Sequence, residues 1–182
     1  NTKEIHVVAI KNEVKELLFV LEKGFSEEVS IEAINLNTLQ PNFKFKLSKE
    51  NNTQIIYQNP IKYLYEPNLA ILKSGAFKTV ALRFELEKLG PNTHLYTSIK
   101  KIENFPGKIY CIDEILPNKK ADIRKKLKGI KANIKTRNYP QTVAQIKKDF
   151  DTIDGGNQYI FFTSTESEKK VLMCSKLITT EI

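Results

Sequence analysis

The stretch GIKANIKTRNYP, residues 129–140, decides how the C-terminal part of the chain is organised. Its apolar residues Ala132 and Ile134 alternate with polar ones, which predicts a strand over residues 132–136 with one apolar face. Pro140 restricts the residue before it, so we expect the strand to give way to a turn there. The opposite face of the strand carries the cations Lys131, Lys135 and Arg137.

The segments around this strand predict alternating strands and helices. Residues 108–115 are typical of a strand, residues 119–128 of a short basic helix, and Thr142 and Gln145 of a capping box that starts a helix over residues 143–150. This alternation favours parallel strands joined by crossover helices. Two further strands, over residues 158–163 and 170–177, are expected to add a hairpin at an antiparallel edge.

The first 59 residues predict a small α+β unit with the order β-α-β-β-β, of ferredoxin-like character. A strand is expected at 4–11, followed by a helix over EVKELLFVLEK, residues 13–23, with Asn12 as its N-cap. The remaining strands are expected at residues 29–36, 43–47 and 54–57, with a turn at residues 50–52 and a unit boundary at Asn59-Pro60.

The part that follows, residues 60–182, is expected to open with two helices, one beginning near Pro67 and one beginning near Phe77 and stopped by Gly90-Pro91-Asn92. A short strand over residues 95–98 precedes the alternating segments. The predicted fold class is therefore mixed, α+β in the first unit and α/β-like in the second.

The positive charge of the chain is concentrated in one segment. The net charge is +8, but residues 1–59 hold seven lysines and eight glutamates, whereas residues 100–137 hold twelve Lys or Arg side chains and four acidic ones. A local excess of this kind favours a polyanionic partner.

We therefore expect RNA phosphate to bind along the basic helix and the cationic strand, with Arg137 forked onto a phosphate and Tyr139 stacked on a base. The alternatives are that the helix cations form an ordinary solvated face, and that Tyr139 packs the strand–helix junction. The expected RNA-binding residues are Lys119, Lys120, Arg124, Lys125, Lys128, Lys131, Lys135, Arg137, Asn138 and Tyr139.

Several other classes of function find no support in the sequence. Glycine-rich nucleotide loops, HExxH and GxSxG are absent. The two histidines and two cysteines are too few and too dispersed for a metal site, and both cysteines are expected as buried thiols in a reduced compartment. No apolar run is long enough to span a bilayer, so a cytoplasmic location is expected. These absences favour a binding module without catalytic residues.

Six blocks of the sequence resemble one bacterial family of proteins. EIHVVAIKNEVKELLFVLEKGF (4–25), YLYEPNLAILKSGAFKTVA (63–81), LGPNTHLYTS (89–98), FPGKIY (105–110), KANIKTRNYP (131–140) and DGGNQYIFFT (154–163) are similar to the C-terminal half of proteins that join a class I S-adenosylmethionine-dependent methyltransferase domain to a THUMP-like domain.

The resemblance implies a ferredoxin-like unit at residues 1–59 and a THUMP-like domain at residues 60–182. It also implies that the chain presents tRNA or another structured RNA to a catalytic domain that lies upstream and holds the S-adenosylmethionine. The first residue is not Met, which is consistent with a piece of a longer protein. The alternative function is protein docking without nucleic acid, through Tyr63 and Tyr65.

Overall fold

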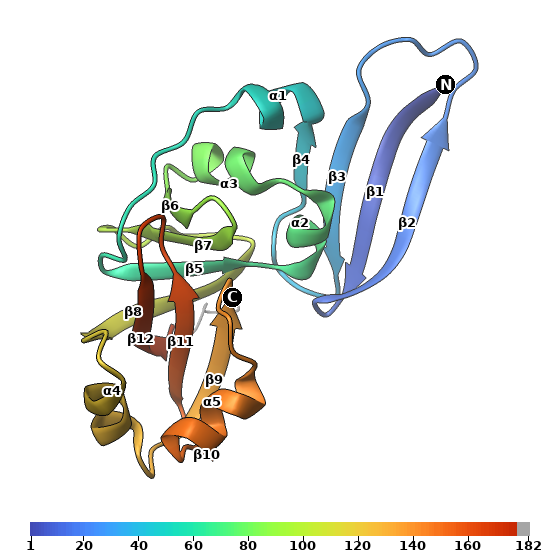
Figure 1. Ribbon diagram of the computed structural model, residues 1–182. Helices are drawn as coiled ribbons and strands as arrows, with labels where there is room; N and C mark the ends of the chain where they lie inside the picture. Colours follow the sequence, from blue (N-terminus) through green and yellow to red (C-terminus); the bar gives the residue numbers. More distant parts are fainter. Residues whose placement is uncertain (178–182) are drawn as a thin grey trace.

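The computed structural model describes residues 1–177, which form two sheets joined through three short helices (Figure 1). The four-stranded sheet has the order β2-β1-β3-β4, and the eight-stranded sheet has the order β10-β9-β11-β12-β8-β5-β7-β6. The four-stranded sheet and the helix after it consist of β1 (Thr2–Ile10), β2 (Glu13–Leu21), β3 (Ser30–Leu36), β4 (Phe43–Lys46) and α1 (Leu47–Asn52).

The eight-stranded sheet begins after a connection over residues 53–62, and its elements run to residue 176. The first half contains β5 (Tyr63–Pro67), α2 (Leu69–Ser74), α3 (Phe77–Arg83), β6 (Glu87–Gly90) and β7 (Thr93–Ser98). The second half contains β8 (Gly107–Leu116), α4 (Lys120–Leu127), β9 (Lys131–Arg137), α5 (Val143–Phe150), β10 (Ile153–Asp154), β11 (Gln158–Ser164) and β12 (Lys169–Lys176). No helix among residues 1–177 is long and apolar enough to cross a membrane.

The helix expected over residues 13–23 is wrong, because this segment is strand β2. Lys11 and Asn12 both have positive φ, 48° and 66°, and Ile10 pairs with Glu13. Two central residues of positive φ are the signature of a tight hairpin turn, so Asn12 turns the chain back and does not cap a helix. The order of the first unit is therefore β-β-β-β-α.

The other local corrections also concern the N-terminal half. Residues 50–52, expected as a turn, belong to α1, and residues 54–57 form only an isolated bridge from Tyr57 to Lys88. Pro67 ends strand β5, and the cap of the next helix is Asn68, whose side chain accepts a hydrogen bond from the Ile71 amide at 3.0 Å. The helix expected to continue to residue 89 stops at Arg83, and β6 follows.

The C-terminal strands and helices occur where the sequence predicts them, but their order in the sheet differs. β9 and β11 pair in parallel, whereas the β11–β12 hairpin lies between β9 and β8. The hairpin is thus central in the sheet and not at its edge. The capping box of α5 is confirmed, with both Thr142–Gln145 hydrogen bonds present.

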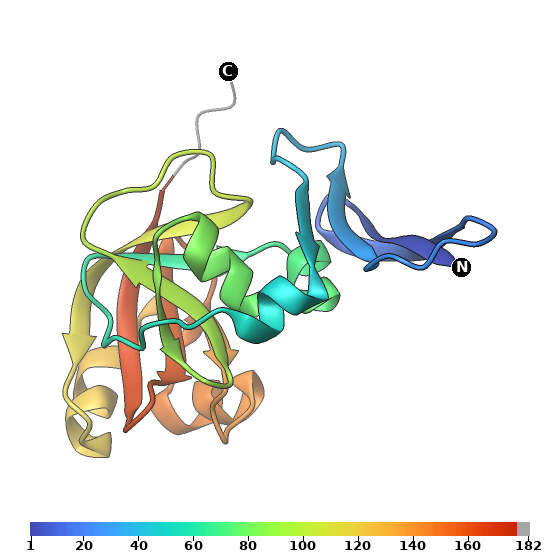
Figure 2. The ribbon, with the colours of Figure 1, turned by 90° about the horizontal axis from the view of Figure 1, so that it is seen from above.

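Three apolar clusters hold these elements together. The first lies between the two sheets, where α2 and α3 cover β1 and β3 on one side and β5 and β7 on the other (Figure 2). The second joins α4 and α5 to one face of β9, β11 and β12, and the third lies on the opposite face, among Leu64, Tyr110, Phe161 and Leu172.

The N-terminal unit is also anchored by Glu50 of α1, whose side chain is buried. Its carboxylate accepts hydrogen bonds from the amides of Phe77, Lys78 and Thr79 at 2.7–3.0 Å. These are the first amides of α3, which have no partner within that helix. A carboxylate from one unit therefore caps a helix of the next.

Candidate nucleic-acid interface

Helix α4 presents its cations to solvent because its two apolar residues anchor it to the sheet. Ile123 and Leu127 are buried in the second cluster, and the remaining side chains of the helix are exposed. Two cations have acidic partners, Lys120 with Asp149 at 3.1 Å and Lys126 with Glu114 at 2.7 Å. Within residues 1–177, no ion pair involves Lys119, Arg124, Lys125 or Lys128.

Strand β9 has the alternation that the sequence predicts. Ala132 and Ile134 are buried against α4 and α5, so the cations of the strand lie on the opposite face of the sheet. Lys131, at the start of the strand, is exposed and has no ion pair in the described part of the chain. The basic helix and the cationic face of the strand are consequently separated by the sheet.

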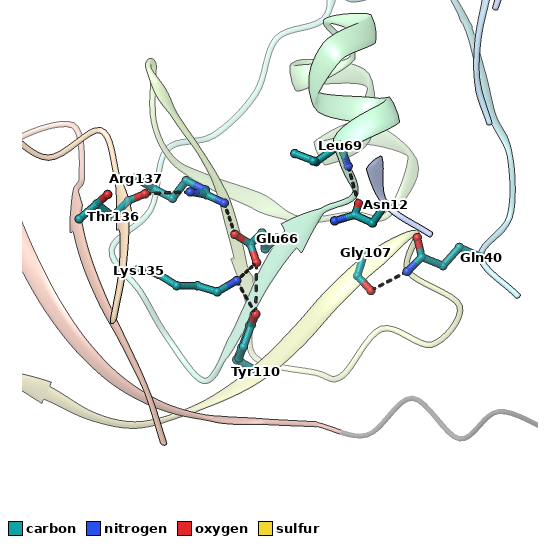
Figure 3. A network of polar contacts seen from close by, with 9 residues as sticks. All are labelled: Asn12, Gln40, Glu66, Leu69, Gly107, Tyr110, Lys135, Thr136 and Arg137. Carbon is teal, nitrogen blue, oxygen red and sulfur yellow. Dashed lines mark hydrogen bonds and ion pairs between the residues drawn. The ribbon is translucent and has the colours of Figure 1, made fainter. Parts of the chain in front are cut away.

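Lys135 and Arg137 bind a buried carboxylate. Both form ion pairs with Glu66 of β5, one on each carboxylate oxygen, and the Glu66 side chain is only 6% exposed (Figure 3). The Tyr110 hydroxyl donates to Glu66 at 3.2 Å and accepts from Lys135 at 3.0 Å. Glu66 is not predictable from the sequence, because nothing local to β5 indicates a partner on β9.

The charge states of Glu66 and Tyr110 follow from their neighbours. Burial alone would raise the pKa of Glu66, but the charges of Lys135 and Arg137 outweigh burial and hold that pKa below its usual value. Burial raises the pKa of Tyr110, and the neighbouring Glu66 carboxylate raises it further. Glu66 is therefore ionised and Tyr110 neutral, so the carboxylate compensates a large part of the charge of the two cations.

Lys135 is further enclosed by aromatic rings. Its ammonium lies 5.4 Å from the ring centroids of Tyr110 and Phe161 and 5.9 Å from that of Tyr159. Contacts of this length stabilise a cation in place. Lys135 is thus a structural residue of the sheet interior, whereas Arg137, whose side chain is 37% exposed, keeps part of its surface accessible.

The turn after β9 is fixed by hydrogen bonds and packing. Asn138 has a φ of 50°, donates to the Thr93 hydroxyl at 3.1 Å, and accepts from the Ser164 hydroxyl through its carbonyl at 2.7 Å. Tyr139 packs edge-on against Phe162 at 5.4 Å and is partly buried. Of the two roles considered for Tyr139, packing is the one that the geometry supports.

A cleft of about 330 Å³ opens beside the Glu66 group, where the β1–β2 turn, β3, α2 and the start of β8 meet. Hydrogen bonds of the Gln40 side chain connect its walls. The amide of Gln40 accepts from Asn35 at 3.1 Å and from Asn68 at 2.9 Å. It also donates to the Gly107 carbonyl at 3.3 Å (Figure 3). Its lining includes four cations and one acid, namely Lys11, Lys108, Lys135, Arg137 and Glu66.

Two cations of this cleft were not expected from the sequence. Lys11 is exposed and Lys108 is half-buried, and neither forms an ion pair within residues 1–177. The hairpin turn between β1 and β2 places Lys11 there, and this turn was not expected because a helix was predicted over residues 13–23. The ten predicted residues therefore divide into an exposed group at α4 and the start of β9, the pair Lys135 and Arg137 beside this cleft, and the turn residues Asn138 and Tyr139, which do not line it.

His94 and Tyr65 occupy structural positions. His94 stacks on Phe77 with ring centroids 3.7 Å apart. Burial, with Lys88 and Arg137 nearby, lowers the pKa of His94 to about 4. Tyr65 is fully buried and its hydroxyl is bonded to Ser98 at 2.9 Å, so the proposed docking surface at Tyr63 and Tyr65 is wrong for Tyr65.

Comparison with known proteins places these elements in families. A model described as a ferredoxin-like domain matches residues 63–106, which contain β5, α2, α3, β6 and β7. A model described as THUMP domain-like matches residues 107–176, which run from β8 to β12. The ferredoxin-like match lies within the part that the sequence assigned to the THUMP-like domain, and the two matches do not extend to residues 1–62.

The chain is also similar to the crystal structure of a "putative methyltransferase from Porphyromonas gingivalis W83". The two share 38% sequence identity with a TM-score of 0.89, and the match covers 97% of this chain and 46% of that one. No curated protein matches the chain. The chain therefore belongs, over residues 63–176, to the ferredoxin-like and THUMP-like domain families that these models describe.

Proposed function

We propose that the chain is the RNA-binding part of a methyltransferase and presents tRNA or another structured RNA to a catalytic domain. That domain would lie upstream, hold the S-adenosylmethionine, and act in the cytoplasm. The THUMP-like match and the similarity to the P. gingivalis protein support this assignment. The proposal concerns residues of this chain only as an RNA-binding surface and assigns them no step of the methyl transfer.

One observation carries the proposal: five exposed cations without an acidic partner in the described part of the chain are grouped around α4 and the start of β9. Four lie on α4 and at its two ends, and the fifth, at the start of β9, follows them in the chain on the opposite face of the sheet. Cations without a local counter-charge are free to neutralise phosphates and release their counterions. These residues are Lys119, Arg124, Lys125, Lys128 and Lys131.

The mode of binding follows from the kind of surface. The five side chains are flexible and lie on a convex helix and a strand end, without an aromatic platform that is free to stack, since Tyr139 is packed. Such a surface contacts the RNA backbone and does not read bases. Backbone and shape recognition is the usual mode for A-form RNA.

The test is fluorescence anisotropy of a labelled tRNA at rising salt concentration. We expect the logarithm of the affinity to fall linearly with the logarithm of salt, by about 0.7 to 0.9 per neutralised phosphate. Changing both Arg124→Ala and Lys125→Ala should weaken binding and flatten the slope by roughly 1.5. The matched control changes two exposed lysines of the first unit that form no ion pair within residues 1–177, Lys23→Ala and Lys46→Ala, and should leave both quantities unchanged.

Two results would contradict the proposal. One is the absence of tRNA binding at low salt. The other is an equal loss of slope in the control, which would mean that only the net charge of the chain matters.

A further inference from the structure

Strand β2 exposes large apolar side chains although it belongs to a folded sheet. It forms one edge of the four-stranded sheet, and β1 is the neighbour with which it pairs among the described residues (Figure 1). Its second half, Leu17–Leu21, carries no charge, and the exposed fractions of Leu17, Phe19 and Leu21 are 56%, 56% and 68%.

The apolar residues of β2 lie on both faces of the sheet. Leu17 is opposite Val7 and Phe19 is opposite Ile5, and directly opposed residues share a face, so these two continue the face that α2 covers. Leu18 and Val20 are opposite His6 and Glu4 and therefore lie on the other face, where Leu36 of β3 and Ile10 of β1 are also exposed.

This pattern is that of an interior strand. A strand that is apolar on both faces is typical of sheets covered by helices on both sides, whereas an edge strand in water normally has one polar face or a charge along its length. The charged residues Glu13, Lys15 and Glu16 are confined to the first half of β2. The second half has neither a charge nor a proline to prevent another strand from pairing with it.

We propose that β2 is continued by a strand of the methyltransferase domain, so that the four-stranded sheet is the end of a larger sheet covered on both faces. The inference rests on the proposed function for the identity of that domain. The P. gingivalis protein offers the necessary extra chain, since the match covers only 46% of it.

A second copy of this chain explains the surface less well. Antiparallel pairing of two β2 strands would satisfy the backbone at the edge, but each copy would still leave Leu18, Val20 and Leu36 open on one face and Phe19 and Leu21 open on the other. An α/β domain supplies a strand and covering helices together, and so accounts for the edge and for both faces.

The test mixes this chain with the purified portion of the P. gingivalis protein that lies outside the match, and follows hydrogen–deuterium exchange. The β2 amides should exchange rapidly in the chain alone and become protected in a one-to-one complex. The substitution Phe19→Lys should weaken the complex on the order of tenfold or more. Leu39→Lys, at an exposed loop leucine away from β2, is the matched control and should have no effect.

The probe is the portion of the P. gingivalis protein outside the match, and the matching portion of the same protein serves as its positive control. If that portion binds the probe without protection of its own β2 equivalent, or if this chain alone forms a dimer in which the β2 amides are protected, the proposal is overturned. The Phe19→Lys variant should bind tRNA as the parent chain does, because β2 lies in the other unit from α4. A loss of docking is thereby distinguished from a loss of RNA binding.

Discussion

Arg137 at the end of β9 forms an ion pair with Glu66 of β5, 71 residues earlier in the chain, and the same carboxylate binds Lys135 through its other oxygen. Glu66 thus joins the THUMP-like residues to the ferredoxin-like residues across the sheet. The three cations of β9 therefore differ in role. Lys135 and Arg137 hold the two domains together, and only Lys131 forms no ion pair in the described part of the chain.

Glu66→Gln should destabilise the protein strongly. It leaves Lys135 and Arg137 without a counter-charge in a buried site, and the loss of one partner of a buried pair costs about 3 kcal/mol or more. The free energy of unfolding from urea titrations measures the effect. Glu103→Gln, which breaks the exposed pair with Lys101, should cost less than about 1 kcal/mol. Equal losses in the two variants would show that burial does not matter at Glu66.

Lys131→Ala and Arg137→Ala should separate RNA binding from stability. Lys131→Ala removes an unpaired cation, so we expect the salt dependence of tRNA affinity to fall by about 0.7 to 0.9 with no change in stability. Arg137→Ala should instead lower the free energy of unfolding and change the salt dependence less, since Glu66 already compensates its charge. A larger change in salt dependence for Arg137→Ala than for Lys131→Ala would contradict this division.

Stability should depend on pH through His94. Its pKa is about 4 in the folded protein and 6.5 in the unfolded chain, so the unfolded state binds more protons between these values. Stability is therefore present above pH 6.5 and is lost on acidification towards pH 4, by about 1.4 kcal/mol per pH unit at most. His94→Phe keeps a ring on Phe77 and should flatten the dependence in this window. An unchanged slope would mean that groups other than His94 cause the pH dependence of stability.

The sequence predicts the elements of the C-terminal half well because their signals are local. The capping box at Thr142 and Gln145 and the alternation of Ala132 and Ile134 depend on neighbouring residues only. The order of the strands is not local, and the insertion of the β11–β12 hairpin between β9 and β8 has no mark in either segment.

The error at β2 has a different physical origin. Its apolar residues satisfy a helical spacing and a strand pattern equally, because both faces of the strand are apolar. The decision depends on the two-residue turn at Lys11 and Asn12, which adopts positive φ at both positions. The cleft shows the same limit, since Glu66, Lys11 and Lys108 line it only through contacts between distant parts of the chain.

Glu50→Ala should loosen the connection between the first unit and α3. The substitution removes the acceptors of three backbone amides and of the Thr79 hydroxyl, which donates at 2.8 Å. Buried hydrogen bonds to a charged group contribute about 1.5–3 kcal/mol each, so the total loss should exceed about 2 kcal/mol. Thr79→Val removes the side-chain donor alone and should cost about 1 kcal/mol. Exchange of the Phe77–Thr79 amides should accelerate in Glu50→Ala and remain slow in Thr79→Val.

Gly107→Ala should destabilise the protein more than any glycine substitution that meets open space. A Cβ at residue 107 would lie 2.2 Å from the Glu66 carbonyl oxygen and 2.8 Å from the Pro67 Cα, and both are backbone atoms that cannot move aside. Strands β5 and β8 would have to separate at the point where Glu66 receives Lys135 and Arg137, so we expect a loss of about 3 kcal/mol or more.

Gly129→Ala is the control for backbone strain alone. Gly129 has a φ of 73° with no atom near the added Cβ, so its substitution should cost only about 1 kcal/mol. Because Gly107→Ala displaces Glu66, its effect should be smaller in a Glu66→Gln background than in the parent chain. Additive losses in this double-mutant cycle, measured by urea unfolding, would show that the strand contact and the ion-pair group are independent.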